Sequence, residues 1–161
     1  MSILSEIAEK TRQRVAQEKK SLPLSRLRAQ AEEMDASTGF PFAQALAAPG
    51  MSFICEVKKA SPSKGLIAPD FPYLDIAMDY QAAGAAAVSC LTEPYWFQGS
   101  DRYLQEIART VSIPVLRKDF TVDEYMIYGA KALGASAVLL ICAILEDGKL
   151  RDYLALAHSL G

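Results

Sequence analysis

The stretch that decides the fold is Phe53-Ile54-Cys55-Glu56-Val57-Lys58-Lys59-Ala60-Ser61-Pro62-Ser63-Lys64-Gly65. It begins as an apolar, β-prone run and ends in a turn-forming segment. Side chains at positions i and i+2 of a strand lie on one face, so Glu56 and Lys58 are predicted to point the same way. Burying two charges is costly unless they are paired and hydrogen-bonded. We therefore predict that the two charged side chains lie at the end of a strand and take part in the chemistry of a pocket there. The alternative is a surface ion pair on an edge strand.

The composition is that of an ordinary globular protein. The chain has 161 residues, of which 51% are hydrophobic and 22% charged, and its formal net charge is -2. This length suffices for one domain with a sizeable core. The charge gives no electrostatic case for nucleic acid or an anionic membrane, and the apolar run at residues 135–145 is shorter than the roughly 20 residues of a membrane span. The first residues lack the regions of a secretion signal. We therefore expect a cytoplasmic protein that binds neither nucleic acid nor membrane.

The cysteines and the histidine offer little for catalysis or metal binding. Cys55, Cys90 and Cys142 lie within or just after predicted strands. Their odd number and wide spacing argue against a disulfide framework and against a zinc site, so we expect small buried hydrophobic residues. His158, the only histidine, lies near the end of a predicted surface helix. We therefore expect no metal and no histidine-based catalysis.

The first 50 residues read as a helical leader. Residues 2–20 form an amphipathic pattern with Ser2 as the candidate N-cap, and Pro23 ends it. Further helices are predicted over residues 24–34 and 42–48. The leader has no predicted strand of its own. We therefore divide the chain into a helical extension, residues 1–50, packed on a core formed by residues 51–161.

From Met51 on, short apolar runs alternate with amphipathic stretches. Strands are predicted over residues 52–57, 87–91, 115–117 and 137–141, and helices over residues 73–83, 101–110, 122–133 and 146–159. Two of the helices run into a glycine, Gly84 and Gly134, just before the next strand. This βα repeat predicts an α/β fold with a parallel sheet and covering helices.

Two architectures share that repeat, the (β/α)₈ barrel and the open doubly wound sheet. Polar residues follow three successive predicted strands: Glu56 and Lys58, Thr92 and Glu93, Lys118 and Asp119. Barrels build their sites at such strand ends, whereas a dinucleotide-binding sheet places a Gly-x-Gly-x-x-Gly turn after its first strand. The sequence has no such turn, and the barrel is therefore favoured.

Four motifs, in this order, resemble the indole-3-glycerol phosphate synthase family of tryptophan biosynthesis: residues 56–65, Leu91-Thr92-Glu93 with Phe97-Gln98-Gly99, residues 114–120 and residues 134–141. The helical leader resembles the family's N-terminal extension. The resemblance implies a TIM barrel lyase that closes the indole ring of 1-(2-carboxyphenylamino)-1-deoxyribulose 5-phosphate. Carbon dioxide and water are lost, and neither a metal nor an organic cofactor is required.

The resemblance also implies catalytic roles. Lys118 matches the general acid that protonates the ribulose carbonyl while the aromatic carbon attacks. Lys58 would contact the substrate's carboxylate and nearby phosphate and hold the reacting atoms in attack geometry. Glu56 would join the lysine network and help move protons during dehydration. Lys64 and Asp119 are assigned to surface positions or to the surroundings of the site.

Five further residues match the family's substrate-binding positions. Ser61 and Pro62 begin a loop over the site, which we expect to close on substrate. Aromatic and aliphatic walls suit a flat anthranilate ring, and the matching residues are Phe97, Phe120 and Leu139. For these three, plain packing in a βα core is the alternative.

The sequence departs from the family pattern in its extent. Only four βα units precede Gly161, whereas a closed barrel has eight and typically about 250 residues. We expect this chain by itself to show little or no synthase activity. Its exposed sheet edges should associate with a second copy or with a missing C-terminal half. The alternatives are another phosphate-handling barrel lyase with a lysine Schiff base, and a non-catalytic half-barrel that serves in assembly.

Overall fold

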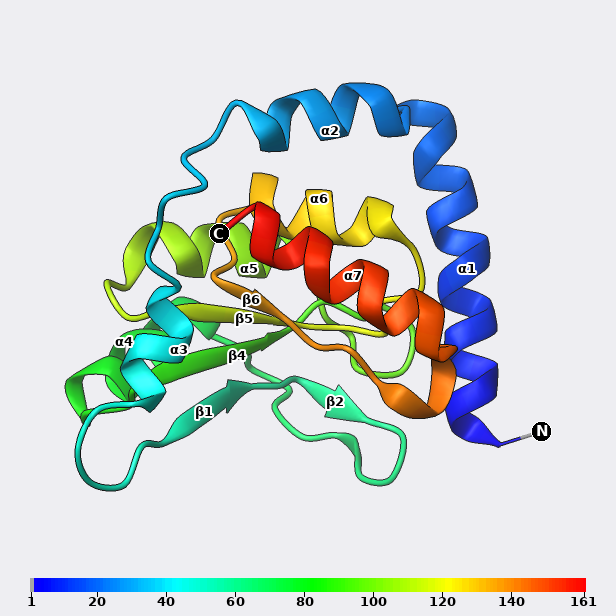
Figure 1. The fold of residues 1–161 in the computed structure, drawn as a ribbon. Helices are drawn as coiled ribbons and strands as arrows, with labels where there is room; N and C mark the ends of the chain where they lie inside the picture. The colour runs from blue at the N-terminus through cyan, green and yellow to red at the C-terminus, as the bar shows by residue number, and fades with distance from the viewer. Residues whose placement is uncertain (1) are drawn as a thin grey trace.

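The computed structural model describes residues 2–161. Its elements are, in order, α1 (Ile3–Ser21), α2 (Leu24–Glu32), α3 (Pro41–Leu46), β1 (Ile54–Val57), β2 (Ala60–Ser61), β3 (Gly65–Leu66), α4 (Tyr73–Ala82), β4 (Ala87–Leu91), α5 (Asp101–Thr110), β5 (Val115–Lys118), α6 (Glu124–Ala132), β6 (Ala137–Val138), the 3₁₀ helix η1 (Cys142–Ile144) and α7 (Asp147–Ser159). Figure 1 shows α5, α6 and α7 over one side of the sheet, with α1 beside the ends to which β1 and β4 point.

The main sheet follows the order of the chain. Its strands lie in the order β1-β4-β5-β6, and each neighbouring pair is parallel. A doubly wound sheet reverses its strand order at a switch point, whereas a barrel adds each strand beside the previous one. The arrangement is therefore that of four consecutive βα units of a barrel, as the alternation of elements predicts.

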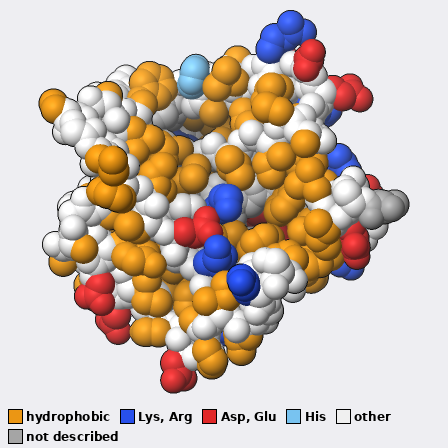
Figure 2. Space-filling view, turned by 90° about the horizontal axis from the view of Figure 1, so that it is seen from below, with side chains coloured by type: hydrophobic (Ala, Val, Ile, Leu, Met, Phe, Trp, Pro, Cys, Tyr) orange, Lys and Arg blue, Asp and Glu red, His pale blue; other side chains and the backbone are white. Residues whose placement is uncertain are grey.

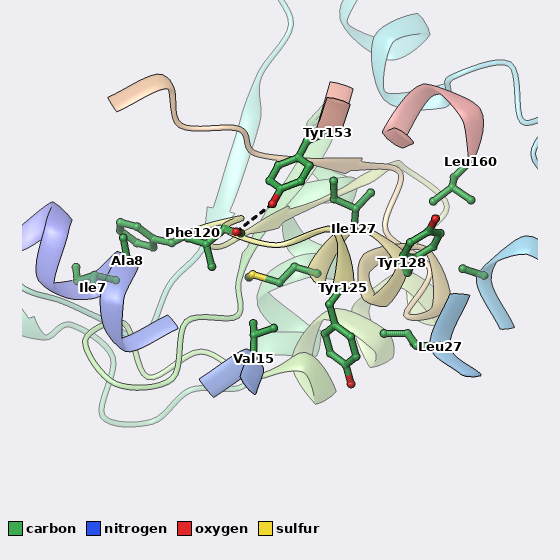
Figure 3. Packing of buried hydrophobic residues seen from close by; sticks show 13 residues of the cluster. Ile7, Ala8, Val15, Leu27, Phe120, Tyr125, Ile127, Tyr128, Tyr153 and Leu160 are labelled. Carbon is green, nitrogen blue, oxygen red and sulfur yellow. Dashed lines mark hydrogen bonds between the residues drawn. The ribbon is translucent and has the colours of Figure 1, made fainter. Parts of the chain in front are cut away.

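Two apolar clusters hold this arrangement together. One lies between the sheet and helices α4 and α5, and its buried members are Val57, Ala77, Val88, Cys90, Leu104, Ile107, Val111 and Val115. The other joins the leader to the far helices: Ile7, Val15 and Leu27 pack with Met126 of α6 and Tyr153 of α7 (Figure 3). The leader thus shares a core with the βα units, while the boundary at residue 50 stays a prediction.

Several local predictions are confirmed. The Ser2 hydroxyl accepts a hydrogen bond from the Ser5 N–H at 3.2 Å and caps α1, and Pro23 directly precedes α2. Gly84 and Gly134 take the left-handed conformation after α4 and α6, with φ of 90° and 89°. Glycine adopts this conformation without a steric penalty, and it therefore ends each helix just before the next strand.

Other expectations are wrong. β6 stops at Val138 instead of continuing to residue 141, since its pairing with β5 ends at the Arg117–Val138 pair. A short antiparallel hairpin, β2–β3, follows β1 where only a loop was expected. The three thiols are free, but only Cys90 is buried; Cys55 is half-buried and Cys142 is exposed. Burial raises the pKa of the Cys90 thiol to about 12.

One buried ion pair joins the leader to the end of β5. Asp119 is 1% exposed, which excludes the surface position and leaves the surroundings of the site as the other expected place, and Arg14 of α1 donates to its Oδ2 at 2.8 Å. The same oxygen accepts from the Thr92 hydroxyl at 2.6 Å. Burial acts to lower the pKa of Arg14, but the charge of Asp119 and its hydrogen bond outweigh burial and raise this pKa. Lys64 is exposed, as expected.

We expect the Arg14→Ala substitution to lower the free energy of unfolding by about 3 kcal/mol, because it leaves the buried Asp119 carboxylate without its nearest cation. Urea denaturation measures the loss. Arg12→Ala is the matched control, since this exposed arginine on the same helix pairs with Glu9 at 3.3 Å, and its loss should stay below about 0.5 kcal/mol. Equal small losses in both variants would contradict a stabilising role for the Arg14–Asp119 pair.

Candidate active site

Two lysine side chains meet at the carboxylate of Glu56. The Lys58 Nζ lies 2.9 Å from Glu56 Oε1, and the Lys118 Nζ lies 3.1 Å from Glu56 Oε2. Glu56 belongs to β1, Lys58 follows it directly, and Lys118 ends β5. The expected pairing of Glu56 with Lys58 is present, and a second ammonium shares the same carboxylate.

The parallel register explains how a lysine of β5 reaches β1. The intervening strand β4 aligns Ser89 with Glu56 and Leu91 with Lys118. Neighbouring strands lie about 4.8 Å apart, so β1 and β5 are separated by roughly 10 Å, a distance that a long lysine side chain spans. Because side chains alternate between faces, Glu56 lies opposite the face that carries buried Val57. The cluster therefore lies on the face of the sheet that α4 and α5 do not cover.

Ser89 is a member of the site that the sequence did not reveal. Its hydroxyl donates to Glu56 Oε2 at 3.2 Å, and the residue is 3% exposed. A serine within an apolar strand is an ordinary small residue, and no charge marks it. The one indication is that Ser89 lies in β4, between the strands that carry Glu56 and Lys118, and opposite Glu56. This indication requires the register of the strands to be known.

The electrostatics keep Glu56 ionised. About one third of each side chain is exposed: 28% for Glu56, 35% for Lys58 and 32% for Lys118. Partial burial acts to raise the pKa of Glu56, but the hydrogen bonds from Lys58 and Lys118 outweigh burial and lower this pKa. Two ammonium groups repel each other, and the carboxylate between them makes their approach favourable. The cluster can therefore present two cations and a proton-accepting group to one molecule.

The surface around this part of the sheet is largely apolar. Ile54, two residues before Glu56 in β1, is 46% exposed, and the preceding Phe53 is 58% exposed. Leu66, in the hairpin after β1, is 51% exposed. Figure 2, which views the molecule from below Figure 1, shows a small group of basic and acidic side chains near the middle of a mostly hydrophobic face. Charged groups with an apolar surround suit a ligand that carries both an anionic group and a ring.

The hairpin after β1 carries the two predicted loop residues. Ser61 is buried, and its hydroxyl accepts a hydrogen bond from the Lys64 N–H at 3.2 Å, while Pro62 is exposed at the turn. The Lys59 carbonyl accepts from the Ile67 N–H at 2.8 Å and anchors the hairpin base next to the end of β1. Both residues therefore lie beside the lysine cluster along the chain. Closure of the hairpin on a substrate stays a prediction.

Two of the three predicted pocket residues lie together. The rings of Phe97 and Phe120 have centroids 6.4 Å apart and an interplanar angle of 42°. Phe120 is buried in the cluster that joins the leader to α6 and α7, and Phe97 packs against that cluster. Leu139 is half-buried just after β6, one position beyond the Arg117–Val138 pair and therefore beside Lys118 in the register. The structure thus supports packing for the two phenylalanines, and a role in ring binding stays a prediction for all three residues.

Other features of the described chain lie apart from this cluster. An apolar hollow of about 210 Å³ lies between α3, α6 and α7, and residues such as Phe40, Ile127 and Leu154 line it. Across residues 2–161, no group of three or more histidine, cysteine, aspartate or glutamate side chains is placed to hold a metal ion. Over the same range, none of the helices combines the length and the apolar character needed to cross a membrane. We identify the Glu56 cluster, not the apolar hollow, as the candidate site because it holds the proton-transfer groups.

Comparison with known proteins gives one consistent result. A family model described as indole-3-glycerol phosphate synthase matches residues 4–161. Proteins named indole-3-glycerol phosphate synthase are similar to the chain: that of Ruminiclostridium cellulolyticum is 52% identical over 99% of the chain and 61% of its own length. The protein of Endomicrobium trichonymphae is 59% identical over 74% of the chain and 46% of its own length, and that of Lacticaseibacillus paracasei is 51% identical over 99% and 61%. The chain therefore spans about six-tenths or less of the length of these relatives.

The lowered pKa of Glu56 predicts a pH dependence of stability. A carboxyl whose folded-state pKa lies below its unfolded value of about 4.3 stabilises the fold above that pH, and this contribution is lost as the pH falls through the folded-state pKa. The stability difference between the wild type and Glu56→Gln should therefore be constant near neutral pH and shrink below about pH 4. Urea denaturation from pH 7 to pH 3 measures it, with Glu32→Gln on the exposed surface of α2 as the reference for loss of one negative charge. A difference that grows on acidification would contradict the stabilised carboxylate.

Proposed function

The chain belongs to the indole-3-glycerol phosphate synthase family, and we propose that its residues serve that family's reaction, the ring closure of 1-(2-carboxyphenylamino)-1-deoxyribulose 5-phosphate in tryptophan biosynthesis, with little activity from this chain by itself. The observation that carries the proposal is the sharing of the Glu56 carboxylate by Lys58 and Lys118. This arrangement joins residues from two strands at one end of the sheet, where barrel enzymes act on their substrates.

Lys118 is the proposed general acid. Its ammonium donates to Glu56 at 3.1 Å, and the side chain is 32% exposed, so it can also reach a bound molecule. The ammonium gives a proton to the ribulose carbonyl oxygen while the aromatic carbon forms the new carbon–carbon bond. The ring carboxylate then leaves as carbon dioxide, and its bonding electrons restore the aromatic ring. The new hydroxyl takes up a second proton and leaves as water, while the neighbouring methylene carbon loses a proton to form the double bond of the indole. Glu56, hydrogen-bonded to Lys118, accepts and returns protons during the dehydration.

Lys58 is the proposed anchor for the anionic parts of the substrate. It lies on the other oxygen of Glu56, at 2.9 Å, and is 35% exposed. The substrate carries a carboxylate and a phosphate, and a charge-assisted hydrogen bond to either is stronger than a neutral one. Phe97 and Phe120, with centroids 6.4 Å apart, supply an aromatic wall for the flat ring. The phosphorylated substrate is thus the proposed small-molecule partner of the site.

We further propose that the protein acts in the cytoplasm. Its three cysteines are free thiols, and Cys142 is exposed. Free thiols persist in a reducing compartment, whereas oxidising compartments favour disulfides. This proposal rests on chemistry alone and is independent of the catalytic one.

Replacing Lys118 by alanine should reduce the low formation of indole-3-glycerol phosphate expected of this chain by about 100-fold or more, to background, because no other group donates the proton in the proposed step. Lys118→Arg should fail similarly, since guanidinium keeps the charge but does not release a proton. Turnover of purified protein and substrate binding by calorimetry are measured in parallel. Lys20→Ala, at an exposed position on α1, is the control and should leave both unchanged.

The two rival functions give different results in the same experiment. Binding by neither wild type nor Lys118→Ala would favour a non-catalytic assembly module. A covalent adduct trapped by borohydride with a keto-sugar phosphate would favour a lysine Schiff-base lyase, because the proposed route forms no imine on the enzyme. Turnover that survives in Lys118→Ala would remove this lysine from the mechanism.

We also propose that the uncovered face and the edges of the sheet associate with further protein, which in a purified sample is a second copy of the chain. β1 pairs with β4 alone among the described strands, and the neighbouring Phe53 is 58% exposed. Exposed edges and apolar patches are ready sites for pairing.

Light scattering should therefore show a weight-average mass that rises with concentration. Phe53→Asp should weaken this association about tenfold, the effect of losing one buried aromatic side chain and adding a charge. Ile3→Asp, which changes a side chain that is 50% exposed on α1, is the control and should associate like the wild type. A wild type that stays monomeric at every concentration would contradict the proposed association.

A further inference from the structure

The segment after β4 closes around a buried carboxylate. Glu93 is 0% exposed, and its Oε1 accepts a hydrogen bond from the Tyr95 N–H at 2.9 Å. Its Oε2 accepts from the N–H groups of Trp96 at 2.7 Å and Phe97 at 3.0 Å. The Glu93 carbonyl accepts a fourth bond, from the Gly99 N–H at 2.8 Å. We call residues 93–99 the Glu93 loop.

The end of the Glu93 loop is sterically defined as well. Gln98 has a φ of 51°, in the left-handed region that side chains other than glycine rarely adopt. A Cβ at Gly99 would collide with the Leu91 carbonyl, so only glycine fits where the loop passes back over β4. A strained residue and a close backbone approach persist only where the surroundings determine the conformation. In this loop, the hydrogen bonds that converge on Glu93 determine the conformation.

The Glu93 loop lies between the two segments that flank the lysine cluster. The Phe97 carbonyl accepts a hydrogen bond from the Ala60 N–H at 3.3 Å, at the start of the hairpin that carries Ser61. The Phe97 ring lies 6.4 Å from the ring of Phe120, two residues after Lys118. The Phe97 N–H is therefore held by Glu93, while the Phe97 carbonyl contacts the hairpin after β1 and the Phe97 ring contacts the segment after β5.

A neutral side chain at position 93 could also accept hydrogen bonds from the peptide groups of the loop, so the charge of Glu93 needs a separate explanation. A buried carboxylate is unfavourable unless hydrogen-bond donors converge on it, and it therefore selects the one loop conformation in which three N–H groups point to it. A loop with a neutral residue at this position could rotate any of these peptides without leaving a charge unpaired. The buried charge thus makes the orientation of Phe97 specific.

We propose that Glu93 is a positioning residue: its carboxylate holds Phe97 in the orientation in which the ring forms the wall for the aromatic part of the substrate. The proposal rests on the proposed function for the identity of the ligand, and on the geometry of the Glu93 loop for the role of Glu93. It assigns to Glu93 an effect on substrate affinity and no part in proton transfer.

The test uses Glu93→Gln, which keeps the size of the side chain but replaces one acceptor oxygen by an NH₂ group that cannot accept from the peptide N–H groups. Trp96, the only tryptophan of the chain, lies in the loop and reports its geometry by fluorescence. The emission of Trp96 should shift, and hydrogen exchange at the amides of residues 95–97 should accelerate. KM for the substrate, or Kd by calorimetry, should rise about tenfold, the loss of one good aromatic contact, with kcat nearly unchanged.

Two further variants make the result specific. Phe97→Ala should give the same rise in KM, and in the double variant Glu93→Gln/Phe97→Ala the rise should be no larger, because residues that act through one another are not additive. Glu32→Gln, the same substitution on the exposed surface of α2, should change none of these quantities. Glu93→Asp retains the carboxylate, and it should restore part of the affinity even if Glu93→Gln is too unstable to assay.

Each outcome decides the proposal. Unchanged Trp96 emission and amide exchange in Glu93→Gln would overturn the role of Glu93 in the loop. Altered loop signals with unchanged substrate affinity, or additive losses in the double variant, would overturn the link from Glu93 through Phe97 to the substrate. A wild type that does not bind the substrate would overturn the proposed function instead, and the loop signals would still test the action of Glu93 on the loop.

Discussion

The site depends on one carboxylate that keeps two ammonium groups together. Without Glu56, Lys58 and Lys118 would repel each other and turn to solvent; with it, both lie within 3.1 Å of a carboxylate oxygen. That contact in turn requires β1, β4 and β5 to be parallel and in register, because Lys118 reaches Glu56 across an entire strand. The packing of α4 and α5 on the other face of the sheet maintains the register. The apolar core therefore determines which charges can meet.

Each strand end combines groups that face a ligand with groups that hold the protein. At the end of β5, Lys118 is partly exposed, whereas its neighbour Asp119 is buried and binds Arg14 of the leader. After β4, the carboxylate of the buried Glu93 accepts hydrogen bonds from the peptide groups of its own loop. This arrangement follows from the alternation of side chains along a strand, because one side chain points to the open face and the next points into the interior. The buried carboxylates therefore hold in place the segments that carry the exposed charged side chains.

The leader is part of this architecture. Its residues Ile7, Val15 and Leu27 lie in the same cluster as Phe120 and Tyr153, and Arg14 adds an ionic contact to the end of β5. The helix α1 therefore braces the segment that follows Lys118. By contrast, the face of the sheet that carries Glu56 is bordered by exposed apolar side chains such as Ile54. The chain spans 61% of the length of the relative from Ruminiclostridium cellulolyticum.

Local spacing alone determined much of this protein. The βα alternation, the helix ends at Gly84 and Gly134 and the shared face of Glu56 and Lys58 all follow from residues a few positions apart, because strand and helix periods act over that range. Only the tertiary structure decided that Lys118 meets Glu56, that Ser89 lies beneath them and that Asp119 binds Arg14, 105 residues away. The sequence also did not predict the hairpin after β1, the early end of β6 or the burial of the Glu93 side chain. The reason is physical: these contacts depend on strand register and on the packing of whole elements, and the register is a property of the assembled sheet that no single segment contains.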